Sequence, residues 1–311
     1  MRVDFEIVHI SRVSKLQPRP EYILVTGNIE ARVAIKNLPD CKTLTIGKRD
    51  TEHVYQTFMD HLLDLQSVYE SLIDEESKKT FCGYWLGRIS NKMSEFVYMN
   101  NAHYLIAGFI PERGAVVIDG GAYDGATGAI FTEMGYKVYG FEMDKVNFSY
   151  AKKVAAKKNF VIENLGLGAY KHEVSYTPAG SATRINSNGS ELAQITTVDA
   201  YVRENNLPSV DFIKLDTEGA ELEILKGAKT SIARFKPILA ISAYHKLDDF
   251  WTLMNFIKSI RPDYEFAMRH GAETPEEEPL NFPSKDELKV LHLLGLEQDR
   301  RYWGECVLFA R

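Results

Sequence analysis

From about residue 111 onward, short apolar runs alternate with longer segments whose apolar positions recur at helical spacing. The runs at 116–118, 138–141, 160–162, 210–215 and 238–241 have the length of buried strands. This alternation favours a mostly parallel sheet with helices on both faces. The carboxyl ends of parallel strands share one edge of such a sheet, and ligands bind along that edge.

Residues 145–158 and 220–229 are predicted to form helices between those strands. Two more strands are predicted near the end of the chain, at 264–267 and 306–309, before and after an acidic, proline-containing stretch. The sequence thus predicts an α/β domain over residues 111–311.

A longer insertion separates the third and fourth strands. Residues 174–176 and 194–196 predict two short strands, and the loop between them is rich in Gly, Ser, Asn and Thr. Loops of this kind often cover a substrate, although a plain surface loop fits the composition equally well.

The first 110 residues follow a different pattern, and we expect them to form an accessory region. Strands are predicted at 22–25 and 43–46, giving a short βαβ-like part before helices. Apolar residues then recur at spacings of three and four, which predicts an amphipathic helix whose face packs on the main domain rather than on a partner. These residues are Val54, Phe58, Leu62, Leu65, Tyr69 and Leu72.

The composition is that of an ordinary globular protein, with 45% hydrophobic and 26% charged residues in 311. The formal net charge is −6 and no long basic run occurs, so we expect no nucleic-acid partner. We also expect no transmembrane segment and no secretory signal, because no apolar stretch is long enough and charged residues interrupt the N-terminus.

The three cysteines are Cys41, Cys82 and Cys306. Their wide spacing and odd number fit neither a disulfide framework nor a zinc site, which indicates a cytoplasmic protein with free thiols.

A glycine-rich turn follows the first strand of the α/β domain, in Asp119-Gly120-Gly121-Ala122-Tyr123-Asp124-Gly125. A dinucleotide fingerprint would require glycine at position 122, where the chain has alanine. A carboxylate at Asp119 would repel a pyrophosphate, but it would attract the amino and sulfonium groups of S-adenosylmethionine. The turn therefore favours S-adenosylmethionine over NAD as the cofactor.

Glu142 ends the second strand and could accept both ribose hydroxyls of a cofactor. NAD sites use an acidic residue in the same way, so Glu142 does not discriminate between the two cofactors. The predicted cofactor-binding residues are Asp119, Gly120, Gly121, Tyr123, Asp124, Gly125, Glu142 and Met143.

Residues 116–311 resemble the FkbM-type methyltransferases in four stretches, at 117–125, 141–144, 212–221 and 242–249. The third stretch is the most specific, since it contains Lys214-Leu215-Asp216-Thr217-Glu218-Gly219-Ala220-Glu221. The resemblance implies the Rossmann-like fold of class I methyltransferases, a seven-stranded, mostly parallel sheet with its last strand antiparallel. It also implies S-adenosylmethionine-dependent O-methylation of a hydroxyl on a sugar, glycan or secondary metabolite.

The resemblance further implies that Asp216 and His245 lie near the reacting centre. Both follow strands, so both would project from the ligand edge of the sheet. We predict that His245 removes the acceptor's proton, alone or shared with Asp216. Two other interpretations stay open: a histidine that bonds loop backbone, and a divalent metal held by Asp216 and His245 with Glu218, although our prediction includes no metal.

Lys214 could form an ion pair with a cofactor-binding carboxylate or serve as a purely structural ion pair. Two alternative functions also remain: an NAD-dependent oxidoreductase on a similar fold, and a non-catalytic cofactor-binding interaction module. The sequence does not identify the acceptor beyond a small-molecule or glycan hydroxyl, and it leaves the oligomeric state open.

Overall fold

The computed structural model describes residues 22–26, 42–46, 51–90, 95–97, 104–271 and 306–311. The chain forms two compact units, one of residues 1–53 with 275–300 and one of residues 54–274 with 301–311. In the first unit, β1 (Tyr22–Thr26) and β2 (Lys42–Ile46) pair in parallel, which confirms the two strands predicted there. The predicted boundary near residue 110 stays a prediction.

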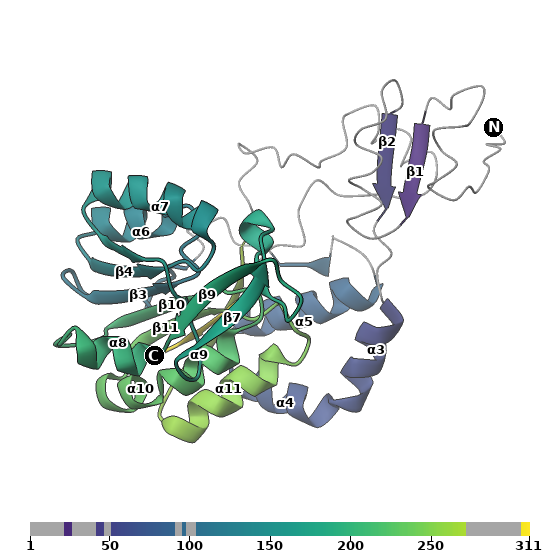
Figure 1. Ribbon diagram of the computed structural model, residues 1–311. Coiled ribbons are helices and arrows are strands. Elements are labelled where there is room, and N and C mark those ends of the chain that lie inside the picture. The colour runs from purple at the N-terminus through teal and green to yellow at the C-terminus, as the bar shows by residue number, and fades with distance from the viewer. Residues whose placement is uncertain (1–21, 27–41, 47–50, 91–94, 98–103, 272–305) are drawn as a thin grey trace. The chain divides into compact units, whose positions relative to one another are not determined.

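The second unit is built on a seven-stranded sheet, here given for the described residues (Figure 1). Its strands are β3 (Val116–Gly120), β4 (Lys137–Phe141), β5 (Val161–Glu163), β10 (Phe212–Leu215), β11 (Ile238–Ser242), β12 (Phe266–His270) and β13 (Cys306–Ala310). They lie in the order β12-β13-β11-β10-β3-β4-β5, and β13 runs antiparallel to both of its neighbours while the other pairings are parallel. The predicted fold class is therefore confirmed.

Helices cover both faces of this sheet (Figure 1). They are α6 (Ala126–Glu133), α7 (Lys145–Lys158), α8 (Val198–Glu204), α9 (Glu221–Gly227), α10 (Lys229–Phe235) and α11 (Asp249–Ile260). The helix predicted at 145–158 has the same bounds in α7, because the Asp144 carboxylate caps its first turn and Asn159 ends it in a left-handed conformation. The helix predicted at 220–229 is instead divided between α9 and α10.

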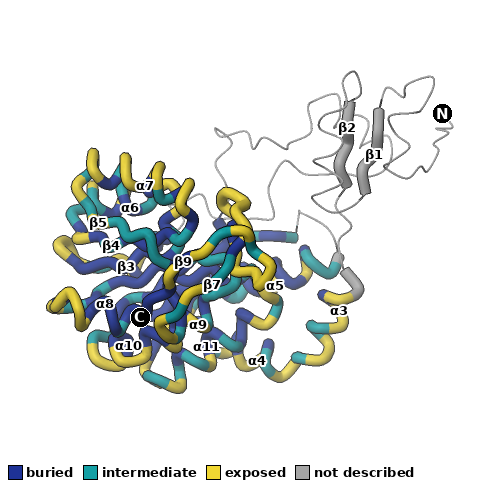
Figure 2. Tube along the Cα trace, viewed as in Figure 1, coloured by how far each residue is buried: buried dark blue, intermediate teal, exposed yellow. Residues whose placement is uncertain are grey.

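Alternate residues of β3 belong to two different cores. Val116 and Ile118 pack with α8 to α11, whereas Val117 packs with Phe131 of α6 on the opposite face. Because both faces are covered, all five residues of the strand are buried (Figure 2). Asp119 lies on the same face of β3 as Val117 and is consequently inside the protein rather than at its surface.

Helices α3 (Thr51–Asp60), α4 (Leu62–Ser71) and α5 (Glu75–Ser90) precede the sheet. The prediction of a single amphipathic helix here is wrong in one respect. The helix breaks at His61, so the apolar positions no longer share one face. Leu65 is buried where α4 packs against α11, but Leu62 is 44% exposed.

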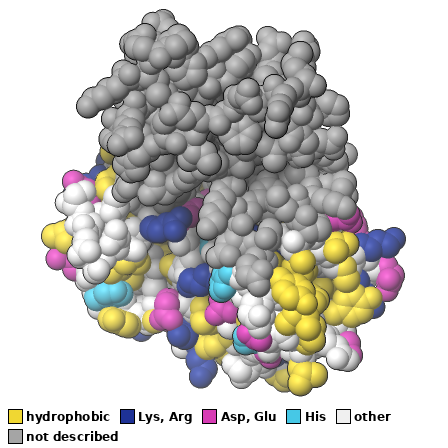
Figure 3. Space-filling view, turned by 90° about the vertical axis from the view of Figure 1, so that its right-hand side faces the viewer, with side chains coloured by type: hydrophobic (Ala, Val, Ile, Leu, Met, Phe, Trp, Pro, Cys, Tyr) yellow, Lys and Arg dark blue, Asp and Glu magenta, His cyan; other side chains and the backbone are white. Residues whose placement is uncertain are grey.

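Apolar side chains are accordingly exposed on the side where α3 lies, and Figure 3 views this side directly. None of the described helices combines the length and apolarity needed to cross a bilayer.

The insertion between β5 and β10 forms a separate four-stranded sheet of β6 (Gly166–Leu167), β7 (His172–Thr177), β8 (Arg184–Ile185) and β9 (Glu191–Thr196). Strands β7 and β9 pair in antiparallel fashion, so the two short strands predicted in the insertion are confirmed. Their connection contains the short helix η2 (Gly180–Ala182).

Candidate active site

A cavity of about 950 Å³ opens at the carboxyl ends of β3, β4 and β10. The connection between β7 and β9 forms part of its wall through residues 180–185, so this loop does face the cavity. Six of the residues predicted to form the site line the cavity, and they are Gly121, Tyr123, Asp124, Glu142, Met143 and Asp216. Asp119, Gly120, Gly125 and His245 lie behind its wall.

Gly121 forms the tight turn between β3 and α6. Its φ is +74°, a conformation that L side chains rarely adopt, and a Cβ atom there would overlap the backbone oxygen of Asp216. The N–H of Gly121 donates to the carbonyl of Phe141 at 3.1 Å. The glycine therefore allows close approach between two segments of the protein's own backbone.

Glu142 is a buried carboxylate at the end of β4. Its Oε2 accepts the N–H of Tyr123 at 2.9 Å, and its Oε1 accepts the N–H of Asp144 at 2.8 Å. Burial raises its pKa to about 7, although these two backbone donors favour the charged form. Each carboxylate oxygen keeps a second lone pair, so the group can still accept two further hydroxyls.

Asp119 forms an ion pair with Lys214 beneath the glycine turn. Its Oδ1 lies 3.0 Å from the Lys214 Nζ, and the two side chains are 0% and 3% exposed. Burial raises the pKa of Asp119, and the Lys214 ammonium opposes that change. The hypothesis of direct contact between Asp119 and a cationic donor does not match this geometry, because strand alternation turns the carboxylate inward. The ion pair suggested for Lys214 is present.

Lys214 also supports the turn itself, since its Nζ donates to the carbonyl of Gly121 at 2.7 Å. The aromatic ring of Tyr104 lies 5.1 Å from the same Nζ. This buried ion pair thus holds the backbone of the glycine turn at the cavity.

Asp124 is the carboxylate at the mouth of the turn. It lines the cavity, and its Oδ1 accepts the N–H of Ala126 at the first residue of α6, at 3.0 Å. A helix N-terminus in this place is where dinucleotide-binding folds receive a pyrophosphate. Here an acidic side chain already occupies that position, which disfavours a diphosphate and tolerates a cation.

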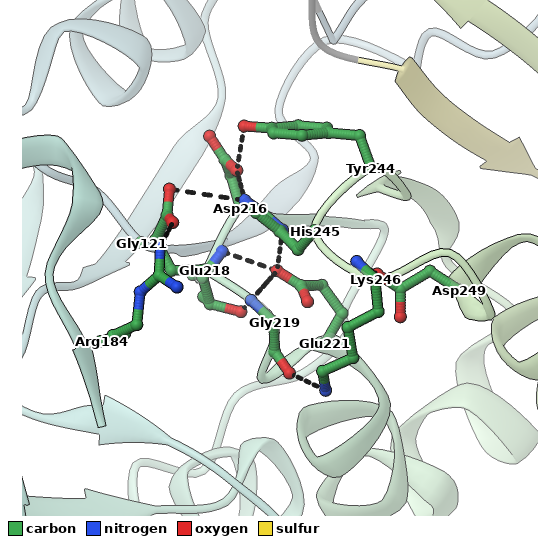
Figure 4. Close-up of polar contacts among 12 residues, drawn as sticks. Gly121, Arg184, Asp216, Glu218, Gly219, Glu221, Tyr244, His245, Lys246 and Asp249 are labelled. Atoms are coloured by element: carbon green, nitrogen blue, oxygen red, sulfur yellow. Dashed lines mark hydrogen bonds and ion pairs between the residues drawn. The ribbon is translucent and has the colours of Figure 1, made fainter. Parts of the chain in front are cut away.

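Asp216 lies at the end of β10 and faces the cavity (Figure 4). Its Oδ2 accepts the hydroxyl of Tyr104 at 2.9 Å, and its Oδ1 accepts the hydroxyl of Tyr244 at 3.3 Å. Burial alone would raise its pKa, but Lys214 and His245 lower the pKa below its ordinary value. The carboxylate is therefore ionised and held by two tyrosines. Sequence reasoning missed Tyr104 because its contact with Asp216 spans 112 positions.

His245 lies behind Asp216, with its side chain 6% exposed (Figure 4). Its Nδ1 is 3.0 Å from Glu221 Oε1, and its Nε2 is 3.4 Å from Glu218 Oε1 and 3.6 Å from Asp216 Oδ1. Burial would lower its pKa, yet these carboxylates raise the pKa to about 10. The predicted convergence of Asp216 and His245 is present in the structure.

The outer part of the cavity carries aromatic and charged groups that the sequence reasoning did not select. The rings of Tyr170 and His172 stack at 4.3 Å and both line the cavity. Arg184 pairs with Glu218 at 3.3 Å, and the Lys246 ammonium donates to the carbonyl of Gly219. Tyr170 is 64% exposed, so this rim is open to solvent.

Within the described ranges, no three His, Cys, Asp or Glu side chains are arranged as metal ligands.

Comparison with known proteins gives one family match, because the model of the methyltransferase FkbM domain matches residues 119–268. The crystal structure of methyltransferase FkbM from Methylobacillus flagellatus KT is similar over 97% of this chain and 77% of that chain, at 21% identity and a TM-score of 0.64. This likeness shows the shared fold. No curated protein sequence matches the chain.

Two further structures are more distant. Precorrin-6y C5,15-methyltransferase from Geobacter metallireducens GS-15 aligns over 70% of this chain and 94% of that chain, at 12% identity and a TM-score of 0.39. An rRNA methylase from Streptococcus thermophilus aligns over 68% of this chain and 98% of that chain, at 14% identity and a TM-score of 0.37.

Proposed function

Since residues 119–268 form a methyltransferase FkbM domain, we propose that this protein uses S-adenosylmethionine to methylate a hydroxyl of a sugar, glycan or secondary metabolite. The observation that carries the choice of cofactor is the Asp124 carboxylate at the N-terminus of α6. The charge of the cavity lining also favours a cationic cofactor, because acidic side chains outnumber basic ones around the cavity. The acidic ones are Asp124, Glu142, Asp216, Glu218 and Glu223, and the basic ones are Arg184, Lys214 and Lys246.

The residues present fit this cofactor. Glu142 has free lone pairs for two ribose hydroxyls, and Met143 and Leu165 supply apolar wall beside it. When bound, S-adenosylmethionine supplies a methyl group on a positively charged sulfur, which is a good electrophile. The same acidic lining disfavours the phosphate backbone of a nucleic acid, so our expectation of no nucleic-acid partner stands as part of the proposal.

Asp216 is the proton acceptor in this proposal. S-adenosylmethionine would give its methyl group to the acceptor oxygen and leave as S-adenosylhomocysteine, and the Asp216 carboxylate would accept the hydroxyl proton and pass it to water. Because the pKa of Asp216 is lowered, its contribution comes from position, which Tyr104 and Tyr244 fix by hydrogen bonds. A positioned base of this kind contributes about 10²- to 10⁴-fold to the rate.

The rim supports a ring-shaped, hydroxylated acceptor. The exposed ring of Tyr170, stacked on His172, offers a flat aromatic surface for the apolar face of a sugar ring. Arg184 and Lys246 lie at the same rim and can donate hydrogen bonds to hydroxyl or ring oxygens.

Calorimetric titration with S-adenosylhomocysteine tests the cofactor assignment. We expect binding that strengthens as the pH rises through about 7, because the raised pKa of Glu142 must be passed before its carboxylate accepts ribose hydroxyls fully. Glu142→Gln should weaken binding by about 10- to 100-fold, as expected for lost hydrogen bonds to a charged group, and should remove this pH dependence.

Glu163→Gln is the matched control for this titration. Glu163 ends the neighbouring strand β5 and does not line the cavity, and a glutamine there can still accept the hydroxyl of Tyr201. We expect this variant to bind like the wild type. Binding of NADH in place of S-adenosylhomocysteine would refute the assignment.

A further inference from the structure

His245 has carboxylates around both of its ring nitrogens. Glu221 is the partner of Nδ1, and Glu218 and Asp216 are the partners of Nε2 (Figure 4). The Glu221 carboxylate is 0% exposed, so the ionised group needs a positive partner inside the protein. Carboxylate oxygens within 3.0–3.6 Å of both ring nitrogens favour the cationic form of histidine, in which each nitrogen carries a proton.

Asp216 and Glu218 lie in the short loop between β10 and α9, and Glu221 is the first residue of α9. Glu218 and Gly219 both have positive φ, at +55° and +98°, and this tight turn directs the loop's acidic side chains toward His245. Glu221 Oε1 also accepts the N–H of Thr217 at 2.8 Å and its hydroxyl at 3.0 Å. A left-handed conformation at a glutamate costs about 1–2 kcal/mol, so this loop needs an external anchor.

The segment that carries His245, between β11 and α11, is itself held in place. Asp249 of α11 accepts the N–H of Lys246 at 2.8 Å, and the Lys246 ammonium donates to the carbonyl of Gly219. His245 therefore lies between two segments that are already tied together, with its side chain 6% exposed and away from the cavity wall.

We propose that His245 is a positioning residue that stays protonated at neutral pH, that its charge holds the carboxylates of Asp216, Glu218 and Glu221 in place, and that it does not receive the acceptor's proton. This role rests on the proposed function, since it concerns the loop that carries the proposed proton acceptor. It replaces our sequence-based hypothesis that His245 is the base, because a base needs a free lone pair directed at the cavity.

The charged and titratable groups around His245 agree with a fixed cation. Asp216 and Glu218 face it from the β10–α9 loop, and Glu221 faces it from the start of α9. The ring of Tyr244 lies 4.2 Å from the ring of His245. Other charged groups nearby are Lys214 on β10, Lys246 on the β11–α11 loop and Asp249 on α11.

The first test is nitrogen NMR of the histidine rings in the isotope-labelled full chain, with the His245 signals identified by their loss in His245→Gln. We expect both nitrogens to carry protons from about pH 6 to about pH 9, as a group stabilised by neighbouring carboxylates does. A neutral imidazole at about pH 7.5 would overturn the proposal.

The second test is the free energy of unfolding of wild type and His245→Gln against pH. The pKa of His245 is raised from 6.5 to about 10 in the folded protein, so its stabilisation is complete below pH 6.5 and disappears as the pH rises toward 10. The difference between the two proteins should shrink over that range. A difference that does not change with pH would contradict the proposal.

Glu221→Gln and Glu223→Gln form a matched pair two positions apart. Glu221 contacts His245, whereas Glu223 lines the cavity and pairs with Lys226. We expect Glu221→Gln, or Glu218→Gln if the first does not fold, to lower the pH at which His245 loses its proton, and Glu223→Gln to leave it unchanged. If Glu221→Gln and Glu223→Gln changed the deprotonation of His245 equally, the positioning role of His245 would be contradicted.

The two failures are distinguishable. A neutral His245 in a protein that binds S-adenosylhomocysteine overturns the positioning role and leaves the proposed function intact. A protonated His245 in a protein that binds no S-adenosylhomocysteine overturns the proposed function instead.

Discussion

Gly121→Ala is expected to weaken binding of S-adenosylhomocysteine by about 100-fold or more and to lower the stability of the fold. The new Cβ atom would overlap the backbone oxygen of Asp216, so either the β3–α6 turn or the end of β10 must move. Those two segments carry the proposed cofactor contacts and the proposed proton acceptor. A displacement of about 1 Å at such a site costs about 10²-fold.

Gly114→Ala separates this clash from simple backbone strain. Gly114 also has a positive φ, +91°, but a Cβ atom there would meet nothing within 4 Å. We expect the free energy of unfolding of Gly114→Ala to fall by only about 1–2 kcal/mol, which is the cost of a left-handed conformation at an alanine. We expect this variant to bind S-adenosylhomocysteine normally. Calorimetry and thermal denaturation of both variants measure the two effects. Unchanged ligand affinity in Gly121→Ala would show that the turn does not contact the cofactor.

Lys214→Met is expected to lower the free energy of unfolding by about 3–5 kcal/mol at neutral pH, as removing one partner of a buried ion pair does. The Asp119 carboxylate would remain fully buried without the ammonium that lies 3.0 Å away. The variant also removes the hydrogen bond from Lys214 Nζ to the carbonyl of Gly121, so the cofactor turn should loosen.

Lys145→Met is the exposed counterpart, because Lys145 pairs with Glu191 at 2.9 Å while both side chains remain accessible to solvent. We expect a loss of at most about 1 kcal/mol there. Adding Asp119→Asn to Lys214→Met should recover part of the loss, since it removes the unpaired charge. Denaturant unfolding of the single and double variants measures this coupling. A loss below about 0.5 kcal/mol in Lys214→Met would contradict the structural role of the pair.

Much of the fold could be predicted because local signals agree with the tertiary arrangement. The run at 116–118 is apolar enough to be a strand buried on both faces, and Asp144 and Asn159 mark the ends of α7. The N-terminal helices were harder to predict, because a break at one residue, His61, rotates the second half of the apolar pattern. Spacing alone carries no signal for such a break.

The edge of the sheet that carries the candidate site could be predicted from the sequence, but the contacts among its side chains could not. Strand ends place Asp119, Asp216 and His245 at the ligand edge, yet they do not tell which side chain faces the cavity and which faces the core. Asp216 faces the cavity, whereas Asp119 pairs inward with Lys214, its register partner on the neighbouring strand. These orientations depend on contacts between residues that lie about 100 positions apart in the sequence. The hydrogen bond between Tyr104 and Asp216 is one such contact.

A crystal structure of the full chain with S-adenosylhomocysteine tests the central claim most directly. The account predicts that the ligand lies in the cavity of about 950 Å³, with its ribose hydroxyls on Glu142 and its sulfur on the side of Asp216. An empty cavity at saturating ligand, or a ligand bound away from Gly121 and Glu142, would contradict the account.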